Sequence, residues 1–153
     1  MLVQQKNILV VDNEPMICKS CKEILEEEGY RVEFAYSGQE GLKKAFGKTF
    51  DLFILDYRLP DISGLSFLER IKAEYQKTPV IMISAYSTVD LVIEAMKQGV
   101  TDFIPKPFTP NELSCAVTSL LSKKREEVER IRDIEIIDKE AVKKVLLKLN
   151  QKI

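Results

Sequence analysis

The strongest chemical signal in the sequence is a carboxylate at the end of an apolar run. Residues 52–55 are four consecutive apolar residues that end at Asp56, and Pro60 and Gly64 interrupt the backbone soon afterwards. A short apolar run bounded by turn residues is typical of a strand buried on both faces of a parallel sheet. We therefore expect Asp56 at the carboxyl end of a strand, where open α/β sheets bind ligands. An isolated Asp could equally cap a turn, so its neighbours decide the interpretation.

Polar side chains follow three other apolar runs in the same way. These runs and the residues after them are 6–11 with Asp12, Asn13 and Glu14, 79–83 with Ser84, and 102–104 with Lys106. If the runs are neighbouring parallel strands, these side chains meet in one shallow cleft. Carboxylates beside a loop carbonyl suit Mg²⁺, which prefers hard oxygen ligands. A carboxylate flanked by a metal, a hydroxyl and an ammonium could accept a phosphoryl group as an aspartyl phosphate.

The elements that would position these residues alternate between strand and helix along about 120 residues. The expected strands are 6–11, 30–36, 51–55, 79–83 and 102–104, and the expected helices are 15–28, 38–46, 64–75, 88–98 and 110–121. Ser37 with Glu40 reads as a capping box for the second helix, and Ser87 as the cap of the fourth. This alternation predicts an α/β fold with right-handed crossovers. We expect a doubly wound, flavodoxin-like (βα)5 parallel sheet in the order 2-1-3-4-5, with a C-terminal helical extension.

Composition narrows the function classes. The 153 residues suit one domain with a modest appendage, and the absence of His excludes His-based catalysis and most zinc sites. No glycine fingerprint follows the first expected strand, which argues against dinucleotide or P-loop nucleotide binding. No apolar run approaches the ~20 residues of a membrane span, so we expect a soluble, cytoplasmic protein without a membrane partner. Cys18 and Cys21 lie in a helical pattern that favours buried structural thiols.

Four short motifs together resemble a known family. They are Val10–Pro15, Asp56–Pro60 with Gly64, Ser84–Tyr86, and Lys106–Phe108, each at an expected strand end. The set resembles the receiver domain of bacterial two-component response regulators over residues 6–122, about four-fifths of the chain. Each motif is weak alone, and their order along the chain makes the resemblance specific.

The resemblance implies a phosphorylation site. Asp56 would take a phosphoryl group from a phosphohistidine on a sensor histidine kinase. Mg²⁺ would be held by Asp12, Asp56 and the backbone carbonyl of Arg58. Ser84 would bond one phosphoryl oxygen and shift toward it, and Lys106 would pair with another.

The resemblance also implies roles for residues around that site. Phe103 matches an aromatic residue that rotates inward when the family switches. Arg58 and Tyr86 match positions that tune hydrolysis of the phosphoryl group, and a bulky pair there could screen the attacking water. The Lys106–Pro107 peptide bond is expected to be cis, an isomer that X–Pro bonds tolerate.

One departure from the family pattern leaves an alternative open. Receivers usually carry two acidic residues after the first strand, and here the second is Asn13. Asn13 is a possible Mg²⁺ ligand without the charge, and Glu14 could compensate or cap a helix. A phosphorylation-independent pseudo-receiver that acts as an interaction module is therefore the alternative. A phosphatase of the haloacid-dehalogenase type is disfavoured, because Tyr57 and Arg58 follow Asp56 where that family needs a second Asp.

The C-terminal segment is compositionally distinct. Residues 122–153 carry 10 basic and 7 acidic side chains. We assign residues 1–122 to the receiver and 123–153 to a helical tail or linker, whose apolar stripe is Val142, Val145, Leu146 and Leu149. The tail could extend the fifth helix into a dimerising linker or pack back on the receiver. A homodimer could form through the tail or through the fourth helix, fifth strand and fifth helix. Direct nucleic-acid binding and enzymatic turnover beyond self-phosphorylation and self-dephosphorylation are not expected.

Overall fold

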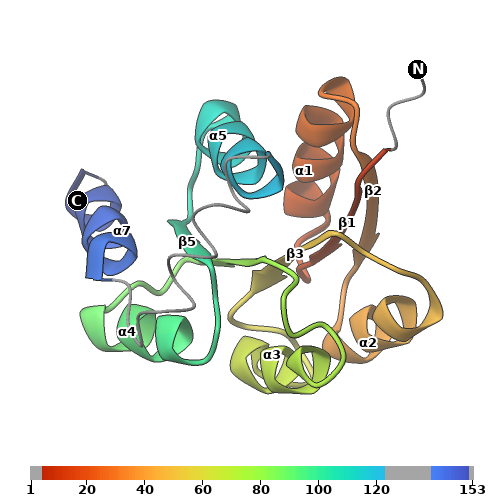
Figure 1. Cartoon of the computed structure of the whole chain (residues 1–153), viewed down its shortest axis with the longest axis horizontal. Coiled ribbons are helices and arrows are strands. Elements are labelled where there is room, and N and C mark those ends of the chain that lie inside the picture. The colour runs from red at the N-terminus through yellow and green to blue at the C-terminus, as the bar shows by residue number, and fades with distance from the viewer. Residues whose placement is uncertain (1–4, 123–138, 152–153) are drawn as a thin grey trace.

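A five-stranded parallel sheet forms the centre of the chain (Figure 1). The computed structural model describes residues 5–122 and 139–151. The strands are β1 (Asn7–Val11), β2 (Arg31–Ala35), β3 (Leu52–Asp56), β4 (Val80–Ser84) and β5 (Asp102–Pro105). They pair in parallel in the order β2-β1-β3-β4-β5, which confirms the predicted flavodoxin-like topology.

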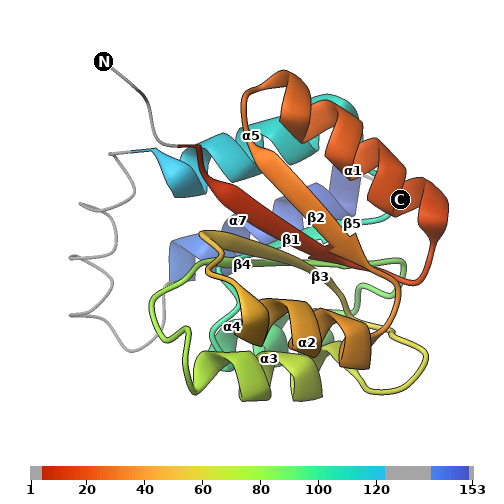
Figure 2. The same ribbon diagram turned by 90° about the vertical axis from the view of Figure 1, so that its right-hand side faces the viewer.

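Helices cover both faces of the sheet (Figure 2). The helices are α1 (Pro15–Glu27), α2 (Gly38–Gly47), α3 (Gly64–Lys72), α4 (Val89–Lys97), α5 (Pro110–Leu121) and α7 (Lys139–Gln151). The apolar faces of α1 and α5 join one core cluster with alternate strand residues, and α2, α3 and α4 join a second cluster on the other face. Strands β3 and β4 are buried at every residue, as expected for strands covered on both faces.

The helix ends correct three details of the sequence prediction. Thr88, not Ser87, caps α4, because its side chain accepts a hydrogen bond from the Leu91 N–H. Ser37 caps α2 as predicted, but the Glu40 carboxylate accepts from the Tyr36 N–H, so the reciprocal capping box is not formed. Helix α3 ends at Lys72, three residues earlier than expected.

The C-terminal helix α7 packs against β5 and α4. Val145 is fully buried in the same core cluster as these elements, and Leu149 packs against that cluster. Helix α5 ends at Leu121, so residues 139–151 fit the interpretation in which the tail packs back on the sheet. The predicted helical character of residues 123–138 and the side chain of Val142 lie outside the described residues, and the domain division at 122 stays a prediction.

The two cysteines of the helical pattern are buried, as the sequence analysis predicts. Cys18 and Cys21 are fully buried on α1, and burial raises the pKa of each thiol to about 12. Both thiols therefore stay protonated, which suits a packing role. Within the residues that the structure describes, no helix combines the length and the apolar composition needed to cross a membrane.

Candidate functional site

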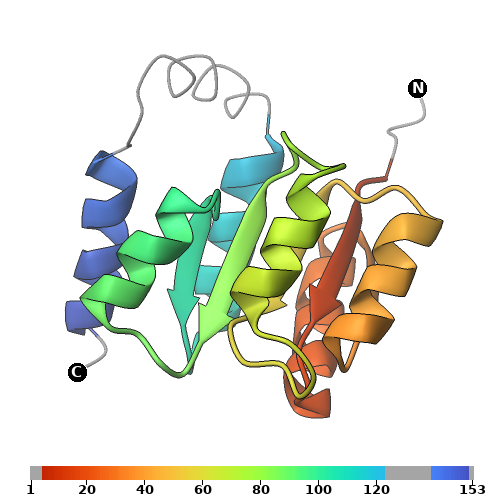
Figure 3. The same ribbon diagram turned by 90° about the horizontal axis from the view of Figure 1, so that it is seen from below.

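The carboxyl ends of the strands, marked by the arrowheads in Figure 3, lie at one edge of the sheet. Asp12 directly follows β1, Asp56 and Ser84 are the last residues of β3 and β4, and Lys106 follows β5. All four lie on adjacent strands in the observed order. The convergence predicted from the four apolar runs is therefore observed.

Gly64 allows the loop after β3 to fold close to Asp56. The Gly64 N–H donates to the Tyr57 carbonyl over 2.7 Å. A Cβ atom at position 64 would lie 2.5 Å from the Asp56 carbonyl oxygen and 2.8 Å from the Tyr57 Cα. Only glycine allows this close approach without displacing the backbone, so Gly64 determines the path of the loop next to Asp56.

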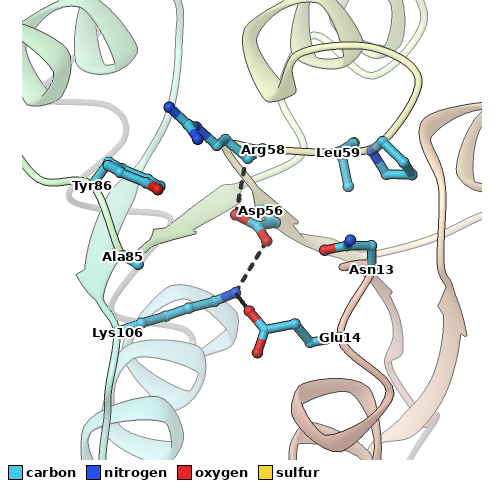
Figure 4. Close-up of a pocket in the computed structure, with 9 residues that line it drawn as sticks. Asn13, Glu14, Asp56, Arg58, Leu59, Ala85, Tyr86 and Lys106 are labelled. Carbon is cyan, nitrogen blue, oxygen red and sulfur yellow. Dashed lines mark hydrogen bonds and ion pairs between the residues drawn. The ribbon is translucent and has the colours of Figure 1, made fainter.

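Lys106 connects three carboxylates, and Figure 4 shows two of them, Glu14 and Asp56. Its Nζ atom lies 2.8 Å from Asp12 Oδ2, 3.0 Å from Glu14 Oε1 and 3.0 Å from Asp56 Oδ2. Backbone N–H groups hold the other oxygens, with Glu14 N donating to Asp12 Oδ1 and Arg58 N donating to Asp56 Oδ1. The site thus has one ammonium for three acidic groups, a local excess of negative charge.

Burial perturbs the ionisation of this cluster. Asp12 is fully buried, and desolvation raises its pKa to about 6, assisted by the nearby negative charge of Asp56 and opposed by hydrogen bonds from Lys106 and the Glu14 N–H. Desolvation works against the charged form of Lys106, but its bonds to Asp12 and Glu14 outweigh this and raise its pKa above the usual value. Lys106 therefore stays protonated, but its charge does not fully offset the cost of burying the Asp12 carboxylate.

The carboxylate cluster fits a divalent cation. Ligand oxygens of Asp12, Glu14 and Asp56 lie within 4.8 Å of one another. Asp12 Oδ2 is buried, and the cation that faces it, Lys106 Nζ, is shared with Glu14 and Asp56. Clustered hard oxygens with surplus negative charge are the donors that Mg²⁺ prefers.

Glu14, not Asn13, supplies the third carboxylate. Glu14 occupies the N-cap position of α1 but makes no side-chain capping bond there, and its carboxylate contacts Lys106 instead. Asn13 is exposed and lines the cleft. The sequence left both roles of Glu14 open, and the structure shows its carboxylate at Lys106 and not in a side-chain cap of α1.

An open cleft of about 350 Å³ lies over these residues and is lined by Asp56, Lys106 and loop residues. The Arg58 guanidinium stacks on the Tyr86 ring, with its Cζ 3.9 Å from the ring centroid. Ser84 is buried, and its hydroxyl oxygen accepts a hydrogen bond from the Tyr86 N–H over 2.9 Å. Phe103 is fully buried in the core, and the Lys106–Pro107 bond is cis as expected.

One residue that supports the site was missed from the sequence. Both carboxylate oxygens of Asp61 accept hydrogen bonds, from Gly38 N and Gln39 N, each over 2.8 Å. These contacts fasten the loop after β3 to the first turn of α2. Because Asp61 caps a helix more than twenty residues earlier in the chain, no local spacing rule could reveal this role.

Comparison with known proteins fits this geometry. The model of the family described as "response regulator receiver domain" matches residues 8–118. The chain belongs to the response regulator receiver family. Receivers are the signalling domains of two-component systems, and the match agrees with the predicted fold and with an acidic Mg²⁺ cluster. Nothing in it favours the pseudo-receiver alternative.

Individual receiver-containing proteins are similar over most of the chain. Response regulator ArlR from Staphylococcus saprophyticus is 37% identical over 138 residues, covering 89% of this chain and 61% of that protein. Transcriptional regulatory protein ZraR from Klebsiella oxytoca is 35% identical over 122 residues, covering 80% and 28%. The chain therefore spans less than two thirds of these curated relatives.

A solved structure shares the fold over nearly its whole length. The CheY-like response regulator receiver domain protein from Methanospirillum hungatei aligns with a TM-score of 0.74 and 33% identity. The alignment covers 83% of this chain and 98% of that structure. The fold of this chain is thus matched by a solved receiver-domain structure.

Proposed function

We propose that this receiver accepts a phosphoryl group on Asp56 from a phosphohistidine of a sensor histidine kinase, in a Mg²⁺-dependent reaction. The observation that carries the proposal is the convergence of Lys106, Asp12 and Glu14 on Asp56 at the open edge of the sheet. A carboxylate oxygen of Asp56 would attack phosphorus while the bond from phosphorus to the imidazole nitrogen breaks. The cleft above Asp56 gives the donor access.

Asp12, Asp56 and the Arg58 backbone carbonyl would hold the metal, with Glu14 replacing the acid that Asn13 lacks. When bound, Mg²⁺ supplies positive charge to the phosphoryl oxygens. Glu14 reaches the cluster from the start of α1, and its contact with Lys106 keeps its carboxylate at the site. Asn13 remains a possible amide ligand at the rim of the cleft.

Ser84 and Lys106 would contact oxygens of the phosphoryl group and change position when the group is present. The Ser84 hydroxyl oxygen accepts a hydrogen bond from the Tyr86 N–H, and this leaves the hydroxyl proton available for a phosphoryl oxygen. Lys106 is already 3.0 Å from Asp56 and remains charged. Displacement of these groups would alter β5, including Phe103, and change contacts on the surface of α4, β5 and α5. We propose partner or homodimer contacts on that surface as the output, with no direct nucleic-acid contact by this chain.

The test is covalent phosphorylation by a small phosphodonor such as acetyl phosphate. Wild type with Mg²⁺ should gain the mass of one phosphoryl group, located at Asp56 by peptide mass spectrometry. Asp56→Asn and addition of a chelator should each abolish the gain. Asp90→Asn, which removes an exposed carboxylate on α4, is the matched control and should be phosphorylated normally. A mass gain that survives Asp56→Asn would overturn the proposal.

A further inference from the structure

Helix α7 is seated on the sheet through a small apolar contact. Val145 is 1% exposed and shares a core cluster with Val92 and Ala95 of α4 and with Phe103 of β5. Leu149, one turn further along α7, packs against the same cluster. Figures 1 and 3 both show α7 beside β5 and α4 at the end of the sheet. The contact therefore covers part of the α4–β5 surface. We define this surface as the parts of α4 and β5 around Val92, Ala95, Asp102 and Phe103.

An ion pair fixes the position of α7 on this surface. Lys148 Nζ lies 3.2 Å from Asp102 Oδ2 and 3.4 Å from Asp102 Oδ1. Asp102 is the first residue of β5, and both side chains are partly exposed. Such a pair adds modest affinity, and it favours the position of α7 in which Lys148 lies next to Asp102.

The strand beneath α7 also leads to the phosphorylation site. Strand β5 has four residues, with Asp102 bound to α7 at one end and Lys106 immediately beyond the other. The Lys106 N–H donates to the Ser84 carbonyl over 2.8 Å, and its Nζ contacts Asp56. Between the two ends, Phe103 is packed in the cluster that receives Val145. A close-packed strand this short transmits a displacement of Lys106 to the α7 seat.

We infer that α7 is an internal ligand of the α4–β5 surface, and that its docking and phosphorylation of Asp56 oppose each other. The inference rests on the proposed function. In the arrangement described here, Ser84 is bonded to the Tyr86 N–H, Lys106 to carboxylates, and α7 is seated. A phosphoryl group that draws Ser84 and Lys106 toward it disturbs β5 and loosens the seat. By linkage, α7 in turn weakens phosphoryl binding, and its release uncovers the α4–β5 surface.

The experiment measures amide hydrogen exchange of the full chain with Mg²⁺, with and without beryllofluoride as the phosphoryl analogue. Without the analogue, Lys148→Glu should speed exchange of the α7 amides about two- to fivefold, the range expected for loss of a partly exposed ion pair. Lys143→Glu makes the same charge change at an exposed position of α7 and should leave exchange unchanged. The charge-swapped pair Asp102→Lys with Lys148→Glu should restore slow exchange.

Beryllofluoride should speed exchange of α7 in wild type and slow it in the loops around Asp56. Lys148→Glu should bind the analogue more tightly, by up to the same factor, whereas Lys143→Glu should not. Protection of the site loops with unchanged or slower α7 exchange would overturn the inference but leave the proposed function standing. If beryllofluoride changed exchange neither in the loops around Asp56 nor in α7, both the proposed function and the coupling would be rejected. Equal exchange in Lys148→Glu and Lys143→Glu would reject the docking contact itself.

Discussion

Lys106 is the residue on which the charge balance of the site depends. One ammonium is shared among Asp12, Glu14 and Asp56 at 2.8–3.0 Å. The sharing keeps the lysine protonated but satisfies the acids only partly. Removal of any one acid therefore has two effects: it removes a partner of Lys106, and it relieves repulsion among the remaining carboxylates.

Asp12→Asn tests this balance through pH. The pKa of Asp12 is about 6 in the folded protein against an ordinary 3.8, so the folded state holds this proton more tightly than the unfolded chain. Ionised Asp12 therefore lowers the free energy of unfolding as pH rises from about 4 through 6. The variant lacks this loss, so its stability relative to wild type should rise by on the order of 2–3 kcal/mol between pH 4 and pH 7 without Mg²⁺.

Urea denaturation at the two pH values measures the difference directly. Asp90→Asn is the control for removal of an exposed carboxylate. A difference between Asp12→Asn and wild type that is the same at both pH values would contradict the prediction.

The stacked side chains of Arg58 and Tyr86 line the cleft beside Asp56. The pair lines the cleft and places a guanidinium 3.9 Å from an aromatic ring. A contact of this kind is worth about 0.5–1 kcal/mol at an exposed site, which corresponds to roughly a two- to fivefold change in loop opening. Arg58→Asn should shorten the lifetime of the phosphorylated protein by a similar factor, because water reaches the phosphoryl group more often.

Mass spectrometry of the phosphorylated form over time measures this lifetime. Arg70→Asn, at an exposed position on α3, is the matched control and should behave like wild type. Equal lifetimes in the two variants would remove the screening role.

At the scale of elements, the loop between β3 and α3 is held close to the sheet at Gly64 and to α2 at Asp61. Gly64 allows it to approach Asp56, and Asp61 joins it to the first turn of α2. The second tie acts as a helix cap supplied from another part of the chain. It fixes the loop that carries Arg58 while leaving the adjacent cleft open.

Asp61→Ala should lower the free energy of unfolding by about 1 kcal/mol, the usual cost of losing a capping side chain. Urea denaturation at neutral pH provides the measurement. Asp61→Asn should lose less, because its amide oxygen can still accept from one N–H group. If the Ala and Asn variants were both as stable as wild type, the cap would have no energetic role.

Element boundaries show where sequence patterns are ambiguous. Ser87 and Thr88 are adjacent capping residues, and only the path of the chain after β4 decides that Thr88 accepts from Leu91. Thr109 and Glu112 form a reciprocal capping box at α5, and their spacing is recognisable in the sequence. Asp61 differs from these local caps, because its partners Gly38 and Gln39 are brought to it by tertiary packing.

For the whole molecule, the fold followed from the alternation of strand and helix patterns in the sequence. The cleft followed because four of the apolar runs end in polar or charged residues. Asp56, Ser84 and Lys106 came together because parallel strands share a carboxyl edge. The seat of α7 did not follow. The stripe containing Val145 and Leu149 predicted an apolar face, but a stripe does not specify the surface that receives it. Homodimer formation stays a prediction.

The position of α7 has a further consequence for self-association of the protein. Strand β5 is the last in the sheet, and such a strand can pair with a strand of another chain. Its last residue, Pro105, offers no backbone N–H, and α7 lies alongside the strand (Figure 1). A neighbouring strand would have to displace α7 to add itself there. The same helix that we place in opposition to phosphorylation therefore also hinders edge-to-edge aggregation at the β5 edge of the sheet.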